Sequence, residues 1–127
     1  MVVGQPTTLL HIDNSKLFAC NGLWKGIRLE QFARISTSNF SEIEDAELAI
    51  YAGAFSQLNI YQTTFNRNRV GIELINSNPL SIFSNGPFVF NFHSNRFTCD
   101  APLNGTTNEI TYAGGRCCMN PMAIAIP

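Results

Sequence analysis

The chain has 127 residues, of which 45% are hydrophobic and 13% charged, and this length suits a single domain. Eight basic and nine acidic side chains give a formal net charge of −1, which argues against a nucleic-acid-binding surface. Ten Phe, three Tyr and one Trp supply more apolar surface than a disordered chain carries. The apolar runs are far shorter than the roughly 18 residues of a membrane-spanning helix. We therefore expect a packed domain that does not cross a membrane.

An internal repeat runs through most of the chain. Four segments share the order apolar, any, apolar, any, any, Ser/Thr/Asn, any, apolar, and they are residues 10–17, 33–40, 58–65 and 90–97. Their second apolar residues are Ile12, Ile35, Ile60 and Phe92, at intervals of 23, 25 and 32 residues. Self-similarity at a nearly constant period is typical of a repeat protein.

A second apolar segment follows three of these repeats, at residues 26–29, 48–51 and 71–74. The alternation of apolar and polar residues predicts strands that point every second side chain inward. The Ser, Thr or Asn within each repeat suits a bend, where its side chain bonds to nearby backbone. Residues 41–49 begin with Ser41 and Glu44 at the spacing of a helix cap. We interpret that segment as a turn or a single helical turn.

Short strands that recur at this period predict a solenoid, and a parallel β-helix fits best. Identical positions would then stack from rung to rung at about 4.7 to 4.9 Å. A β-sandwich or barrel is the alternative, but it predicts strands about every 8 to 12 residues without the longer repeat. The spacing predicts about four to five rungs in residues 1–103. Residues 104–127 break the register and are expected to form an irregular cap, with an additional strand at 122–126.

The four cysteines are too few for a fold built on disulfides, and they allow three full pairings. Cys117 and Cys118 are adjacent, so a bond between them would be strained. The disulfide candidates are Cys99 with either of these two residues, which would tie the C-terminal segment to the body. The chain has no CxxC pair and no His near the adjacent cysteines. We expect no metal site and no cofactor.

Several motifs resemble a known group of proteins. They are LWKGI at 23–27, ARISTSNF at 33–40, IEDAELAI at 43–50 and FNRNRVGI at 65–72. These resemble the W-x-G-I, I-x-x-S-x-I, E-D-A-x-x-A-I and F-x-x-N-x-x-G-I patterns of bacterial extracellular, pectate-lyase-like β-helix proteins. The resemblance covers residues 10–97 and implies a right-handed β-helix in a secreted or cell-surface protein. Members of the group are long, which implies that the chain is a fragment of a longer helix, and its first residues do not read as a signal peptide.

Four residues directly follow the second apolar residue of the repeats. They are Asp13, Ser36, Tyr61 and His93. The repeat register predicts that they stack on one outer face, as a polar and aromatic strip that would suit a glycan. Outward residues stack on every β-helix, however, so an ordinary solvated face is the competing interpretation.

Two further sets of charged residues lie close together in the sequence. Arg67 and Arg69 are two positions apart and would share a face on a strand, as contact with a sugar acid or phosphate requires. A solubilising charged turn is the alternative. Glu44 and Asp45 are adjacent carboxylates, but neighbours on an extended chain point to opposite faces and cannot share a substrate without a bend. We assign no catalytic residue.

The expected function is that of a non-catalytic β-helix segment, either a structural stalk or a surface that binds a glycan or a protein partner. The alternative is a carbohydrate-active enzyme, a polysaccharide lyase or glycoside hydrolase of the resembled group, with its active site partly outside this chain. Polysaccharides or other surface proteins are the expected partners. Exposed strand edges at the ends of a short stack also predict end-to-end self-association.

Overall fold

The computed structural model describes residues 1–3, 8–75, 85–103 and 122–125. These residues form thirteen β-strands and no helix, arranged in three sheets. The β1 sheet contains β1 (Val2–Val3), β4 (Ile27–Leu29), β7 (Leu48–Ala52), β10 (Val70–Leu74) and β13 (Met122–Ala125). The β2 sheet contains β2 (Leu9–Asp13), β5 (Arg34–Ser38), β8 (Gln57–Tyr61) and β11 (Phe88–His93). The β3 sheet contains β3 (Lys16–Leu17), β6 (Ser41–Glu44), β9 (Thr63–Asn66) and β12 (Arg96–Thr98).

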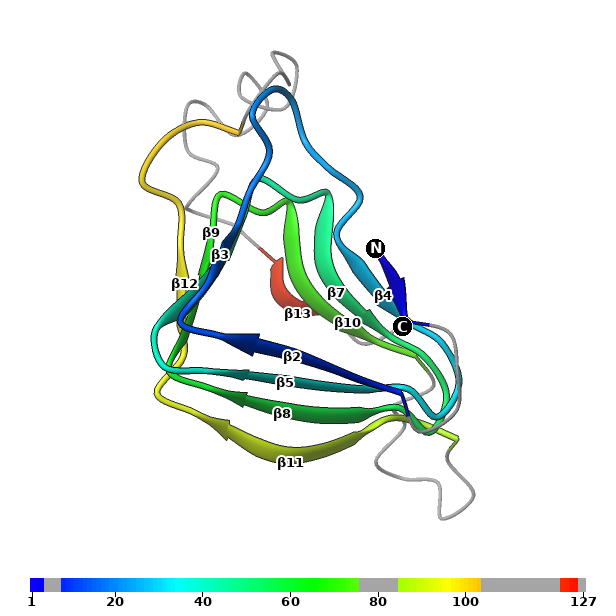
Figure 1. Cartoon of the computed structure of the whole chain (residues 1–127). Helices are drawn as coiled ribbons and strands as arrows, with labels where there is room; N and C mark the ends of the chain where they lie inside the picture. The colour runs from blue at the N-terminus through cyan, green and yellow to red at the C-terminus, as the bar shows by residue number, and fades with distance from the viewer. Residues whose placement is uncertain (4–7, 76–84, 104–121, 126–127) are drawn as a thin grey trace.

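The chain visits the three sheets in a constant order. It runs through β2, β3 and β4, then β5, β6 and β7, then β8, β9 and β10, and then β11, β12 and β13. We call each such pass a cycle. Every strand pairing is parallel, and Figure 1 shows the three sheets as the sides of a common interior. The expected all-β class with parallel strands is confirmed, and the arrangement is compatible with a parallel β-solenoid.

Buried apolar side chains stack along the interior of each sheet. In the β1 sheet, Ile27, Ile50 and Ile72 occupy one column and are each 1% exposed or less. In the β3 sheet, the rings of Phe65 and Phe97 stack at 4.9 Å with an interplanar angle of 9°. Full burial of such side chains contributes roughly 1.5 to 3 kcal/mol each. The three predicted strands at 26–29, 48–51 and 71–74 are therefore confirmed as one stacked sheet.

The predicted register is wrong in the second cycle. The repeat pattern aligned Ile35 with Ile12 and Ile60, but the structure pairs Thr37 with both of these residues. Thr37 is fully buried, and its hydroxyl shares a hydrogen bond of 2.7 Å with that of Thr63. A polar side chain thus occupies an interior position. Because the pattern required an apolar residue there, it shifted the frame of this cycle by two residues.

The interpretation of residues 41–49 as a turn is also wrong. Ser41–Glu44 is strand β6, in which Ile43 pairs with Leu17 on one side and Phe65 on the other. The repeat pattern had placed Phe40 at this interior position, but Phe40 is 78% exposed and Ile43 is fully buried. The cap-like spacing is a local signal. Stacking between two neighbouring cycles overrides it.

Corners in the left-handed conformation recur between the β2 sheet and the β3 sheet. The residues with positive φ at this corner include Asn14 at 44°, Asn39 at 54°, Gln62 at 48° and Ser94 at 57°. Asn is among the residues that adopt this conformation at least cost. The next corner of the cycle, between β6 and β7 and between β9 and β10, places Asp45 at 59° and Arg67 at 53°. This second corner carries a cluster of charged side chains centred on Arg67.

The expected C-terminal strand is present as β13, where Ile124 pairs with Ile72 of β10. Residues 104–121 lie outside the described residues, so the predicted division into rungs and an irregular segment stays a prediction. Among the described residues, none belongs to a helix of the length and apolar character needed to cross a membrane.

Candidate functional site

The outer face of the β2 sheet carries a ladder of polar side chains, one from each of three cycles. Ser36, Asn59 and Asn91 occupy paired positions on β5, β8 and β11. The Asn59 amide donates to the Ser36 hydroxyl at 3.3 Å, and the Asn91 amide donates to the Asn59 carbonyl at 2.9 Å. We call these three residues the amide ladder. Each cycle repeats a similar hydrogen-bonding group along the stack.

The four residues of the predicted polar strip, Asp13, Ser36, Tyr61 and His93, do not occupy one column of paired positions. Tyr61 and His93 are paired, and their rings stack at 5.5 Å with an interplanar angle of 23°. Ser36 lies in the amide ladder instead, and Asp13 pairs with Ser38. The two-residue frame error in the second cycle explains why Ser36 was placed beside Tyr61. The structure brings together Tyr61 and His93, and not the full set of four.

Asp13 is held at the end of β2 by two side chains of the following corner. Its Oδ1 accepts hydrogen bonds from the Ser38 hydroxyl at 2.7 Å and from the Asn39 amide at 2.5 Å. The Ser38 hydrogen bond, together with that of Asn39, lowers the pKa of the Asp13 carboxyl. Asp13 therefore stays ionised and braces the first corner against the second.

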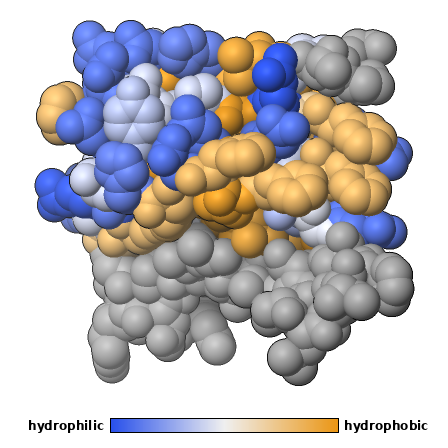
Figure 2. Space-filling model, turned by 90° about the horizontal axis from the view of Figure 1, so that it is seen from below, coloured by the Kyte–Doolittle hydropathy of each residue, from blue (hydrophilic) through white to orange (hydrophobic). Residues whose placement is uncertain are grey.

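Aromatic rings that are exposed or half-buried lie at or just before the start of the same strands. Phe32 and Phe55 stack at 5.1 Å with an interplanar angle of 8°, and Phe88 and Phe90 stack at 6.3 Å and 28°. We call these four residues the aromatic patch; Phe90, for example, is 64% exposed. Figure 2 views this side of the molecule and shows polar side chains gathered on one part and apolar side chains on another.

Sequence reasoning missed the aromatic patch, although a signal was present. Phe32 and Phe55 are 23 residues apart, which is the interval of the repeat itself. Both adopt positive φ, 63° and 56°, which is uncommon for a bulky residue. The repeat pattern describes strand positions only, so it does not predict a role for a Phe that lies in a corner between strands.

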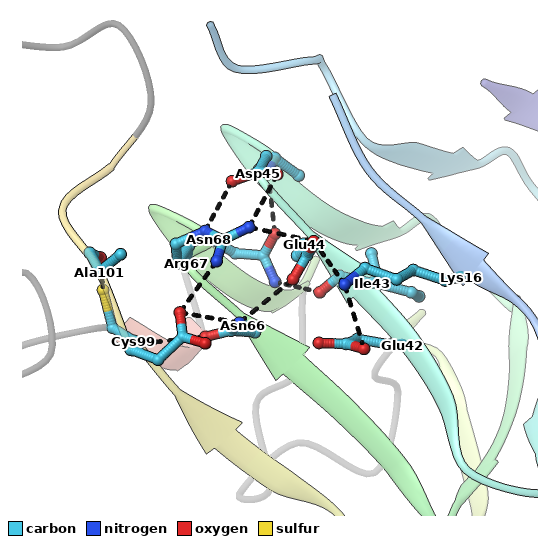
Figure 3. Close-up of polar contacts among 12 residues, drawn as sticks. Lys16, Glu42, Ile43, Glu44, Asp45, Asn66, Arg67, Asn68, Cys99 and Ala101 are labelled. Carbon is cyan, nitrogen blue, oxygen red and sulfur yellow. Dashed lines mark hydrogen bonds and ion pairs between the residues drawn. The ribbon is translucent and has the colours of Figure 1, made fainter. Parts of the chain in front are cut away.

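A second cluster is centred on Arg67 (Figure 3). Its guanidinium donates to both carboxylate oxygens of Asp45, from Nε at 2.9 Å and from Nη2 at 3.2 Å. Nη1 donates to Asp100 at 2.9 Å, and Nη2 lies 3.0 Å from Glu44 Oε1. One cation thus contacts three carboxylates. Glu44 and Asp45 lie where β6 ends, and Asp100 lies shortly after the end of β12. We call these four residues the Arg67 cluster.

The bend at Asp45 brings adjacent carboxylates together. Glu44 ends β6 and Asp45 has a left-handed backbone, so both side chains reach Arg67. The side chains of Glu44 and Asp45 are only 4% and 2% exposed. Lys16 Nζ lies 2.8 Å from Glu44 Oε1, and the Asn66 amide donates to Glu44 Oε2 at 3.1 Å. The sequence alone showed no bend at this point.

The prediction that Arg67 and Arg69 share a face on a strand is wrong. Both lie in the turn between β9, which ends at Asn66, and β10, which begins at Val70. The Arg67 side chain is 19% exposed and is engaged by carboxylates of its own chain, whereas Arg69 is exposed. Asn68 between them is buried and accepts from the Ala46 amide at 2.9 Å, which anchors the turn.

The surroundings of Glu44 and Asp100 keep these two carboxyls ionised. Burial raises the pKa of Glu44, but hydrogen bonds from Lys16 and Asn66 and the charge of Arg67 outweigh burial and lower it. Hydrogen bonds from Asn66 and Arg67 also lower the pKa of Asp100. A general acid at neutral pH needs a raised pKa. The described residues also contain no group of three metal-binding side chains. The arrangement suits structural bracing better than acid–base chemistry.

These lowered pKa values predict a loss of stability in acid. A carboxyl with a depressed folded-state pKa stabilises the fold above its unfolded pKa, and this stabilisation is lost as the pH falls through the folded value. For Glu44 and Asp100 the ordinary values are 4.5 and 3.8, so the loss should begin near the upper of these and continue below both. Urea midpoints at pH 7 and pH 3 measure it. The change should be smaller in Glu44→Gln, and equal wild-type midpoints at the two pH values would contradict the expectation.

A shallow cleft lies beside the same cluster. It has a volume of about 240 Å³ and is lined by Lys16, Leu17, Phe18 and Trp24. The Trp24 indole donates to the Glu44 carbonyl at 2.7 Å and packs against the buried core. Lys16 Nζ lies 5.9 Å from the Phe18 ring centre, but its charge is shared by Glu42 and Glu44. Trp24 thus fastens a loop of the first cycle to β6.

The cysteines are in two states. Cys99 is part of a disulfide, and Cys20 is an exposed free thiol. Cys117 and Cys118 lie outside the described residues. The pairing of Cys99 with one of them stays a prediction.

Comparisons with known proteins add no relative. No protein-family model matches the chain, and no curated protein and no solved structure matches it.

Proposed function

We propose that the chain is a section of a right-handed parallel β-helix in a secreted or cell-surface protein of the pectate-lyase-like bacterial kind, and that it binds a glycan without catalysing a reaction. The constant order of the sheets and their parallel pairing support the helix. Connections between parallel strands of one sheet are right-handed in about 98% of cases, which supports the handedness. A stalk role is compatible with the same architecture.

The observation that carries the proposed binding is the amide ladder on the outer face of the β2 sheet, together with the aromatic patch at or before the start of the same strands. Amide and hydroxyl groups exchange hydrogen bonds with sugar hydroxyls, while exposed rings cover the apolar face of a sugar. Successive groups of the ladder follow the strand spacing of about 4.8 Å, so a polymer along the stack would meet a similar group at each cycle. The ladder and the patch contain no Asp, Glu, Lys or Arg. This favours a neutral glycan over a polyuronide.

The enzyme alternative has less support among the described residues. The carboxylates brought together in the structure are Glu44, Asp45 and Asp100, and all three are ion-paired with Arg67. A pair of carboxylates for glycoside hydrolysis must instead flank a substrate and differ in protonation. Incubation with polygalacturonate, followed by the absorbance of unsaturated products, tests the lyase form of this alternative directly.

Affinity electrophoresis through gels that contain a soluble β-glucan, xylan, mannan or polygalacturonate tests the proposed binding. We expect one of the neutral polymers to retard the chain. The double variant Asn59→Ala/Asn91→Ala should weaken this retardation by about tenfold, which corresponds to roughly 1.4 kcal/mol. Phe88→Ala should also weaken it.

The matched control for this experiment is Phe40→Ala. Phe40 is 78% exposed but lies at the corner after β5, outside the ladder and the patch. It should leave retardation unchanged. Migration that none of the polymers alters would overturn the proposed glycan binding, and retardation by polygalacturonate alone would overturn the preference for a neutral polymer.

A further inference from the structure

Strand β11 is the most exposed regular element among the described residues. All six of its residues, Phe88–His93, are exposed, although the strand pairs with β8 on both sides of a bulge at Phe90. Val89 pairs with Leu58 and Phe92 with Ile60, so both continue buried columns of the β2 sheet. In β8 these columns are 1% and 0% exposed, whereas Val89 is 44% and Phe92 is 37% exposed. Two columns of apolar side chains that are buried at β8 are thus exposed to solvent at β11.

The Phe92 column is exposed at this end of the stack and buried at the other end, where the Val89 column continues to a half-buried Leu10. At the other end, the interior residues Val3 and Ile12 are only 6% and 4% exposed. Along the described chain, β11 is hydrogen-bonded to a strand on one edge, because it ends the order β11-β8-β5-β2. An exposed apolar edge strand is a ready template for pairing with another chain. The sequence FVFNFH is rich in aromatic residues and contains no Asp, Glu, Lys or Arg that would oppose such pairing.

We propose that two copies of this chain join tail to tail through the outer edge of β11, with the two strands antiparallel about a two-fold axis. In a two-fold interface the same surface serves both copies, so a single exposed edge is sufficient. The centred register places Val89 opposite Phe92 of the second copy, and Phe92 opposite its Val89. Both exposed columns are then covered by apolar side chains. This proposal is independent of the proposed glycan binding.

Head-to-tail stacking fits the observations less well. It would pack β11 against β2 of the first cycle, where Ile12 is already buried and Leu10 is half-buried, so less apolar surface is open there than at β11. It would also continue the column of Lys16, Glu42, Thr64 and Arg96, so that Arg96 of one copy would meet Lys16 of the next. Like charges at paired positions of neighbouring strands are destabilising. The tail-to-tail arrangement closes on itself and leaves no such contact in this column.

Light scattering during gel filtration, from low to high micromolar concentration, tests the oligomeric state of the whole chain. We expect a concentration-dependent species with twice the 14.1 kDa of the monomer. Val89→Glu alone and Phe92→Lys alone should each weaken the dimer by about a hundredfold, because each places two charges against apolar side chains. Phe40→Lys is the control, because it adds a charge at an exposed corner away from β11. It should dimerise like the wild type, and circular dichroism checks that all variants are folded.

A mixture of Val89→Glu and Phe92→Lys tests the register. The heterodimer would contain one Glu–Lys pair and one native Val–Phe pair, so mixing should restore a dimer that neither variant forms alone. A monomer at every concentration would overturn the proposal. Hydrogen exchange would then show whether the outer edge of β11 is covered in the monomer. Protected β11 amides in a monomer would mean that another part of the same chain pairs with this edge. Open-ended oligomers that Val89→Glu leaves intact would also overturn it.

Discussion

Replacing Gly26 with Ala is expected to unfold the chain or to leave it close to unfolding. A Cβ atom at this position would lie 1.6 Å from the Leu48 carbonyl oxygen and 2.7 Å from its carbonyl carbon. These are backbone atoms at the start of β7, so they cannot move aside without separating two cycles. The φ of 92° adds conformational strain for any residue with a side chain. We expect a loss of about 4 kcal/mol or more, which is a large part of the stability of a typical domain.

Gly22→Ala is the matched control for this substitution. Gly22 also has a positive φ, of 70°, but a Cβ atom there would meet nothing within 4 Å. Its cost is that of the left-handed conformation alone, about 1 kcal/mol. The midpoints of urea unfolding, followed by circular dichroism, compare the two variants. Similar losses for both would show that the close approach at Leu48 does not govern the packing of the cycles.

The close approach at Gly26 also explains one of the motifs in the sequence. Gly26 precedes Ile27, and Gly71 precedes Ile72, while Ala49 takes the corresponding position before Ile50. The three isoleucines form one buried column of the β1 sheet. At Gly26 the lack of a side chain lets the backbone approach that of Leu48. This part of the fold was predictable because the spacing of small and apolar residues records it directly.

The second cycle was harder to predict for a physical reason. Its interior includes Thr37, whose polarity is satisfied by the Thr63 hydroxyl rather than by water. A buried hydrogen-bonded pair is indistinguishable from two surface residues when only one sequence is read. The same frame error separated Ser36 from its true neighbour, Asn59, and hid the amide ladder. Tyr61 and His93 were placed correctly because the third and fourth cycles share one frame.

The Arg67 cluster was not predictable for a different reason. Asp45, Arg67 and Asp100 are far apart in the sequence and meet only after three cycles have stacked. The spacing in the sequence predicted a shared face for Arg67 and Arg69. Both residues instead lie in the turn between β9 and β10, where their side chains have different surroundings. A correct frame would have shown that Asp45 and Arg67 occupy the same corner of successive cycles, 22 residues apart. Opposite charges at one corner are the signal that predicts such a cluster.

Arg67→Met should be among the most destabilising substitutions in the described part of the chain. It removes the guanidinium and leaves Glu44 and Asp45, at 4% and 2% side-chain exposure, without their main counter-charge. Removing one partner of a buried ion pair typically costs about 3 to 5 kcal/mol, because the remaining charge has lost both water and its partner. Arg69→Met, two positions along the same turn, alters an exposed side chain and should change stability by less than about 0.5 kcal/mol. Urea midpoints at pH 7 measure both effects.

Two further variants separate the charge of Arg67 from its shape. Arg67→Lys keeps the charge but cannot make the two-pronged contact with Asp45, so it should recover only part of the loss. Asp45→Asn added to Arg67→Met should also recover part of it, because one uncompensated carboxylate is then removed. If Arg67→Met and Arg69→Met had equal midpoints, the cluster would contribute nothing to holding the cycles together. The single variant Arg67→Met and the double variant lose the same packing around the arginine side chain. Recovery of stability in the double variant would therefore show that the destabilisation comes from the unpaired carboxylates.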